Sequence, residues 1–112
     1  MAAIYNLVVD QGTTFIANIR YLDSDKNPID ITGFDARSQM RRSYTSANAY
    51  TLTANVTDGA GGNVTISMSA ADSANVQSGR YVYDVEAYNA NTGTVHRVVE
   101  GIVTVYPEVT KI

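Results

Sequence analysis

Two acidic side chains on one expected strand are the first candidates for chemistry in this sequence of 112 residues. Asp84 and Glu86 alternate within a run rich in tyrosine and valine, so both point to the same face of the strand. Paired carboxylates can hydrolyse glycosidic bonds. Alternating acids on an exposed strand also arise simply from solvation, or from pairing with arginines on a neighbouring strand. Arg37 and Arg41 are suitable partners, and we therefore predict a structural role for the two acids.

Two further patterns could carry chemistry, a lone histidine and a glycine-rich turn. His96 has no nearby serine, cysteine or second ligand with which to form a catalytic triad or a typical metal site. We expect it to lie on a strand at the surface. Gly59, Gly61 and Gly62 lack the lysine and hydroxyl residue of a phosphate-binding loop, and they indicate a hairpin turn instead. The sequence therefore predicts no catalytic residue, no metal site and no cofactor.

The pair Arg41-Arg42 with Tyr44 could contact nucleic acid through charge and stacking. The whole chain, however, has 8 Lys and Arg against 11 Asp and Glu, which gives a net charge of −3. General nucleic-acid binding normally requires a basic excess. We therefore predict a protein contact or plain solvation for these residues, and no nucleic-acid partner.

Length and composition limit the classes of protein to which this chain can belong. The length suits one domain that spans residues 1–112. Cysteine is absent, so disulfides and thiolate metal sites are excluded, and a small secreted domain without them would be unusual. The N-terminal residues lack the features of a signal peptide, and no apolar run approaches the ~18 residues that span a bilayer. We expect a chain made in a cytoplasm with no membrane partner.

Hydrophobic periodicity predicts an all-β fold, because apolar and polar residues alternate in segments bounded by turn formers. The two richest segments, 79–86 and 98–110, are separated by turn formers at 89–93 and predict two long antiparallel strands. Shorter strands are expected at 4–9, 14–22, 34–41, 50–56 and 64–68. A short helix should follow Ser69, a suitable N-cap, and run to about Val76. About seven or eight strands with regular turns predict an immunoglobulin-like antiparallel β-sandwich.

The outward faces of the last two strands are the best candidate for an interaction surface. If Val99 and Val103 face the core, alternate residues of the same strand face outward. Arg97 shares the parity of Val99, which indicates the rim of the strand or a bulge. The residues that face outward include many apolar and aromatic side chains. This indicates either cover by a loop or by the N-terminal strand, or a protein–protein interface. The predicted contact residues are Val98, Ile102, Tyr106, Tyr88 and Arg41.

Five segments carry a family resemblance: residues 10–15, 27–37, 67–74, 79–86 and 100–110. Together they resemble the small immunoglobulin-like modules of tailed bacteriophages. These modules include the N-terminal domains of upper baseplate proteins and related tail or head accessory proteins. The resemblance spans residues 10–110, and its motifs are turn and core signals. In the baseplate proteins further domains follow the module, whereas this chain stops at Ile112. A module without further domains would also suit the neck or the capsid surface of the virion.

The resemblance implies a non-enzymatic structural protein of the virion, located in the tail, baseplate or neck. Its partners would be other virion proteins, and virion symmetry implies self-association or insertion into a ring. One alternative is a capsid decoration protein, present in many more copies. A second alternative is a carbohydrate-binding module that attaches the phage to host glycans, for which Tyr44, Tyr50 and Tyr88 could supply an aromatic platform.

Overall fold

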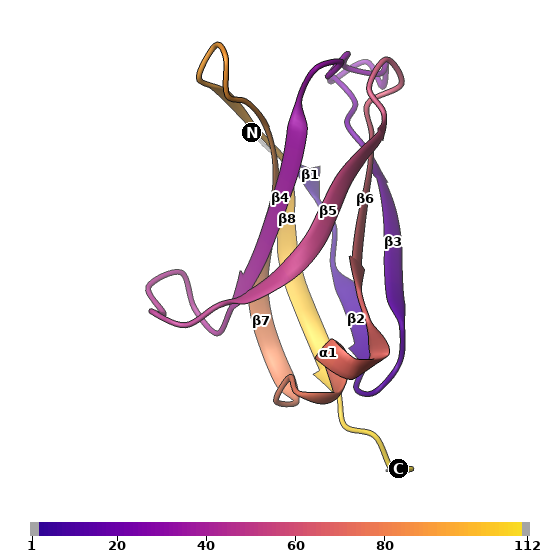
Figure 1. The fold of residues 1–112 in the computed structure, drawn as a ribbon, viewed down its shortest axis with the longest axis vertical. Helices are drawn as coiled ribbons and strands as arrows, with labels where there is room; N and C mark the ends of the chain where they lie inside the picture. Colours follow the sequence, from indigo (N-terminus) through magenta and orange to yellow (C-terminus); the bar gives the residue numbers. More distant parts are fainter. Residues whose placement is uncertain (1–2, 111–112) are drawn as a thin grey trace.

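The computed structural model describes residues 3–110 of the chain. The described part consists of eight strands and one short helix connected by turns and loops (Figure 1). In chain order the elements are β1 (Ala3–Ile4), β2 (Leu7–Asp10), β3 (Phe15–Arg20), β4 (Asp35–Arg41), β5 (Tyr50–Asp58), β6 (Asn63–Met68), α1 (Ala70–Ala74), β7 (Gly79–Asn89) and β8 (Thr94–Tyr106).

The strands form two layers that are joined along one side by β5. The strand order is β1-β8-β7-β4-β5-β6-β3, and β2 also pairs with β8. Strand β5 pairs with β4 near residues 50–52 and with β6 over residues 53–58, so it passes from one layer to the other. Figure 1 shows β5 crossing between the layers. This arrangement is the immunoglobulin-like β-sandwich that the sequence predicts, and β7 and β8 are its two long antiparallel strands.

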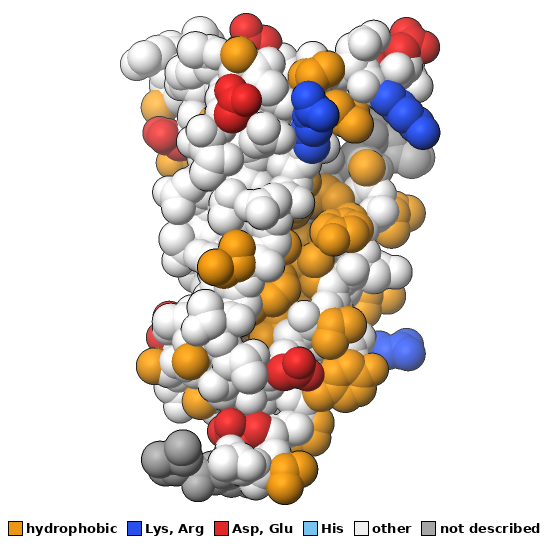
Figure 2. Space-filling model, turned by 90° about the vertical axis from the view of Figure 1, so that its right-hand side faces the viewer, with side chains coloured by type: hydrophobic (Ala, Val, Ile, Leu, Met, Phe, Trp, Pro, Cys, Tyr) orange, Lys and Arg blue, Asp and Glu red, His pale blue; other side chains and the backbone are white. Residues whose placement is uncertain are grey.

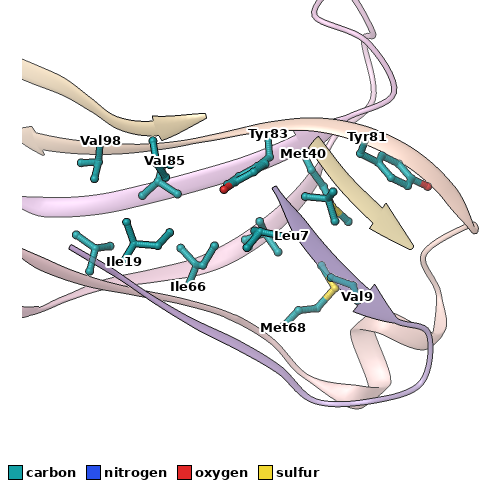
Figure 3. Packing of buried hydrophobic residues seen from close by; sticks show 14 of the residues in the cluster. Leu7, Val9, Ile19, Met40, Ile66, Met68, Tyr81, Tyr83, Val85 and Val98 are labelled. Carbon is teal, nitrogen blue, oxygen red and sulfur yellow. The ribbon is translucent and has the colours of Figure 1, made fainter. Parts of the chain in front are cut away.

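The core lies between the layers and is filled by alternate residues of every long strand. Met40 and Val85 come from one layer and Ile66 from the other, and all three are fully buried. Leu7 and Val9 of β2 project between the layers (Figure 3). The alternation predicted for 14–22, 34–41 and 50–56 is confirmed, because burial in each segment alternates with a period of two residues.

The N-terminal segment differs from the single strand predicted at 4–9. It forms two short strands parallel to β8, interrupted at Tyr5 and Asn6. The Asn6 side-chain oxygen accepts a hydrogen bond from the Ile102 N–H at 3.0 Å, in place of a regular ladder bond. The backbone of Tyr5 packs against Gly101 so closely that a Cβ there would lie 2.4 Å from the Tyr5 carbonyl oxygen. The segment therefore extends the edge of one layer and leaves the outer face of that layer uncovered.

A bulge in β8 overturns one prediction. The register between β7 and β8 steps from Val85–Val99 to Glu86–Arg97, so Val98 is an extra residue. Val98 and Val99 both turn into the core and are 3% and 2% exposed. The prediction that Val98 faces outward is therefore wrong, because strict alternation fails across a bulge. The position of Arg97 beside a bulge is confirmed.

The predicted helix is present but shorter than expected. The Ser69 hydroxyl caps α1 by accepting a hydrogen bond from the Asp72 N–H at 3.1 Å. The helix ends at Ala74, because the N–H groups of Asn75 and Val76 bond to carbonyls three residues back and tighten the last turn. Val76 then enters the core, where it is buried.

Candidate interaction surface

The outward side chains of β4, β7 and β8 lie in rows that the strand register defines. Arg37, Glu86 and Arg97 form one row across the three strands. The next row contains Gln39, Asp84 and Glu100, and the third contains Arg41, Val82 and Ile102. We call this surface the outer face. It places acidic, basic and apolar side chains on a rigid hydrogen-bonded sheet.

Ion pairs connect the charged rows of the outer face. Arg37 Nε donates to Glu86 Oε1 at 2.7 Å. Arg97 lies 3.5 Å from a carboxylate oxygen of Asp84 and 3.1 Å from one of Glu100. The arginine side chains are about half exposed, so each pair contributes only ~0–1 kcal/mol to stability. The predicted pairing of Asp84 and Glu86 with arginines is confirmed, and Arg97 takes part where Arg41 was expected.

Charge crowding also changes the acidity of Asp84. Burial raises the pKa of the Asp84 carboxyl, and the neighbouring Glu86 carboxylate raises it further, while the Arg97 guanidinium opposes the rise. Asp84 and Glu86 are thus members of a crowded network in which each carboxylate has an arginine partner. This geometry supports a structural role for the ion-paired residues. We call them the charge ladder: Arg37, Asp84, Glu86, Arg97 and Glu100.

An apolar patch borders the charge ladder where β2 joins β8. It consists of Val8, Val82, Ile102 and Tyr106, and we call it the β2–β8 patch. Val8 lies beside Thr104, between Ile102 and Tyr106 along β8, and Val82 is paired with Ile102. Val8, Ile102 and Tyr106 are 56%, 40% and 53% exposed. The outward orientation predicted for Ile102 and Tyr106 is confirmed, and their role as contact residues stays a prediction.

The other predicted contact residues lie at two places on the outer face. Tyr88 is half-buried, and the Arg37 guanidinium covers its ring at 4.6 Å from the ring centroid. Arg41 shares the row of Ile102 but turns toward the 43–49 loop, where it donates to the Ser46 carbonyl at 2.7 Å. The structure therefore brings Arg41 and Ile102 into one row and places Tyr88 several residues along the strand from them.

The proposed aromatic platform is not assembled. Tyr50 turns inward and its ring packs edge-on against Tyr81, with the ring centroids 5.7 Å apart. Tyr44 is 78% exposed on the 43–49 loop. Because Arg37 covers Tyr88, the three rings expected for a sugar-binding platform do not form one surface.

His96 lies differently from the prediction. It pairs with the buried Ala87 and so faces inward, although the sequence suggested a residue at the surface. Its ring centroid is 5.9 Å from that of Tyr21 and 5.7 Å from that of Phe34. His96 is therefore a half-buried packing residue at one end of the sandwich. Across residues 3–110, no group of acidic residues or histidine is clustered for metal binding.

Sequence reasoning missed a polar clamp formed by the 10–15 segment. The Gln11 side chain donates to the Val76 carbonyl at 2.8 Å and accepts from the Glu108 N–H at 3.1 Å. The Ser73 hydroxyl accepts from the Gly12 N–H at 3.1 Å. These bonds fasten the β2–β3 turn to α1 and to the segment after β8. A glutamine beside a glycine in a turn was the only signal in the sequence, and it did not reveal partners more than 60 residues away.

A search for membrane-spanning elements found no helix in the described residues that is long and apolar enough to cross a bilayer.

Comparison with known proteins supports the fold alone. No family model and no curated protein matches the sequence. Among solved structures, the chain resembles InlP of Listeria monocytogenes with a TM-score of 0.51 and 19% identity, over 93% of this chain and 26% of InlP. It thus spans about a quarter of the InlP chain. The NK cell receptor NKp44 aligns with a TM-score of 0.48 and 14% identity, over 95% of this chain and 99% of the receptor. The likeness to InlP agrees with an immunoglobulin-like domain.

Proposed function

We propose that the chain is a non-enzymatic structural protein of a tailed-bacteriophage virion, and that it serves as a protein–protein interaction module in the tail, baseplate or neck. The assignment to a virion rests on the resemblance of the five segments within residues 10–110 to phage immunoglobulin-like modules. The assignment to protein interaction rests on the β2–β8 patch, which is exposed beside a ladder of charges.

The patch has the composition of a contact surface. Exposed valine, isoleucine and tyrosine side chains lie together on paired strands, where their positions are fixed by the backbone ladder. The cores of protein interfaces are apolar and rich in aromatic residues, and charged residues surround them. The neighbouring ion-paired residues would then orient the partner more than they would increase affinity.

The symmetry of a virion would determine which neighbours the chain contacts. Positions in a tail, baseplate or neck are arranged around symmetry axes, so a module there contacts copies of itself or enters a ring. In the proposed role the β2–β8 patch meets a neighbouring virion subunit, and the loops at either end of the sandwich lie against adjacent subunits. No reaction is required of any side chain.

Quantitative mass spectrometry of purified particles, with heads and tails separated, tests this proposal. A few copies per particle in the tail fraction would support it. Hundreds of copies in the head fraction would contradict the tail position and identify a capsid decoration protein. Complete absence from the particles of the phage that encodes the chain would overturn the virion proposal altogether.

A further inference from the structure

A cleft of about 500 Å³ opens beside the end of β4, between the 43–49 loop and the beginning of β7. Two consecutive arginines line it, Arg41 and Arg42, together with the rings of Tyr50 and Tyr81. We call it the arginine cleft. It adjoins the outer face through Arg41, and the ion pairs described above involve neither of its arginines.

Neutral oxygen atoms hold the guanidinium group of Arg41 in place. Its Nη1 donates to the backbone carbonyls of Ser46 and Ala47 at 2.7 and 3.3 Å. Its Nη2 donates to the Gln39 side-chain oxygen at 3.0 Å. These contacts fix the position of the group without neutralising its charge, because amide oxygens carry no net charge.

Arg42 is held in a similar way on the other side of the cleft. Its Nη2 donates to the Ser78 carbonyl at 2.9 Å, and its guanidinium lies 4.5 Å from the centroid of the Tyr81 ring. Gly79 makes room for it, since a Cβ there would approach Arg42 Nη1 to 2.2 Å. The absence of a side chain at position 79 therefore lets the guanidinium lie flat against the strand.

The two charges have no carboxylate partner within 4.0 Å among residues 3–110, where the three ion pairs are formed by Arg37 and Arg97 alone. A guanidinium has five N–H donors, and two such groups line the same cleft. Each still has N–H donors that bond to no oxygen of residues 3–110. Planar guanidinium groups that are already positioned match carboxylates especially well, because two parallel hydrogen bonds can form at little cost in side-chain entropy.

We propose that the arginine cleft binds the carboxylates of a short acidic segment in a partner protein. The charges around it favour this ligand over nucleic acid. Arg41 also borders a neighbouring cleft that contains Asp84, Glu86 and Glu100. A polyanion that continued along the outer face would meet these three carboxylates, whereas a segment with only one or two acidic residues would not. The proposal does not depend on the assignment to a virion.

A direct binding experiment tests the cleft. The probe is a fluorescently labelled peptide with two adjacent glutamates flanked by glycine and serine, titrated at low salt with the intact chain and followed by fluorescence polarisation. Arg41→Gln and Arg42→Gln should each weaken binding about fivefold, because each removes a charge-assisted hydrogen-bond donor group. The double variant should abolish binding. Arg80→Gln is the matched control, because it removes the same charge from an exposed arginine of β7 that does not line the cleft.

A lysine variant separates the effect of charge from that of side-chain geometry. Arg42→Lys keeps the charge and loses the planar fork, so it should bind with intermediate affinity, and circular dichroism verifies that the variant is folded. Failure of the unaltered chain to bind the peptide would overturn the proposal, as would an equal loss in Arg80→Gln. Tighter binding of a twelve-nucleotide single strand through the same arginines would overturn it in favour of nucleic acid. If the chain binds the peptide but is absent from virions, the proposed role of the arginine cleft stands and only the proposed function is rejected.

Discussion

The Tyr83 hydroxyl of β7 donates a hydrogen bond to the backbone carbonyl of Tyr5, reaching beneath β8 to the interrupted edge of the sheet. Its register partner on β8 is Gly101, the glycine against which the Tyr5 carbonyl packs. Burial raises the pKa of the Tyr83 hydroxyl above its usual range, so the group remains a donor throughout physiological conditions. One side chain thereby anchors the N-terminal edge to the centre of the layer.

Tyr83→Phe should lower the free energy of unfolding by about 1–2 kcal/mol, because the Tyr5 carbonyl loses its donor in a partly buried setting. Urea denaturation gives the change in stability. Hydrogen exchange should also show faster exchange at Tyr5 and in β2 than in β7. Tyr106→Phe is the matched control, since that ring is exposed and its loss of a hydroxyl should change stability by less than about 0.5 kcal/mol. Equal effects in the two variants would refute the anchoring role.

Ser73→Ala should destabilise the chain by about 1–3 kcal/mol. The fully buried Ser73 hydroxyl donates to the Thr13 carbonyl at 2.7 Å and accepts from the Gly12 N–H, and the substitution leaves both groups without that partner. Thermal denaturation measures the effect. Ser67→Ala, on a half-buried position of β6, serves as the control and should change stability little. A neutral Ser73→Ala variant would show that the clamp contributes nothing.

The carboxyl of Asp84 should titrate above the usual midpoint of 3.8 in a carbon-13 NMR experiment. Because the folded state binds this proton more tightly than the unfolded state, its contribution to the free energy of unfolding falls as pH rises through the raised pKa. Glu86→Gln should lower the Asp84 midpoint by removing a like charge, and Arg97→Gln should raise it by removing an opposing one. A midpoint at or below 3.8 in the unaltered chain would contradict the crowding described for the outer face.

Ile102→Asp should leave the fold intact and prevent assembly through the β2–β8 patch, because it places a charge at the centre of an apolar contact. Incorporation into particles, or self-association in analytical ultracentrifugation, measures the effect, and circular dichroism verifies the fold. Val95→Asp supplies the control, as Val95 is similarly exposed on β8 but lies far from the patch. Normal assembly of Ile102→Asp would remove the patch from the interface.

The regular strands of this fold could be predicted from the sequence, because the alternation of apolar and polar residues that defines them is a local property of the chain. Alternation with a period of two places Phe15, Leu52 and Val103 toward the core, and the structure agrees. Val98 could not be placed this way, since a bulge depends on how β8 registers with β7. The break at Tyr5 and Asn6 likewise depends on contacts with residues almost a hundred positions away.

The candidate interaction surface, like the fold, could be predicted only in part from the sequence. Ile102 and Tyr106 follow the regular pattern, and their exposure was expected. The pairing of Arg97 with Asp84 and Glu100 follows from the bulge and was not anticipated. Arg41 was expected to meet an acid, but the adjacent 43–49 loop folds back and offers its carbonyls instead.

The parallel pairing of β2 with β8 has a mechanical consequence. β1 and β2 are the first strands of the described chain and β8 is the last. In Figure 1, β1 lies in the upper half of the view and β8 ends near the bottom. A stretch applied between the ends would pull β2 and β8 in opposite directions along their length. The residue pairs that β1 and β2 form with β8, from Ala3–Val99 to Asp10–Tyr106, would then carry the load together, in shear, instead of opening one after another. Figure 2 shows a strip of apolar side chains along the length of the molecule, on the side where β3 lies in Figure 1. In that geometry the pairing of β2 with β8 would resist a stretch along the length of the domain.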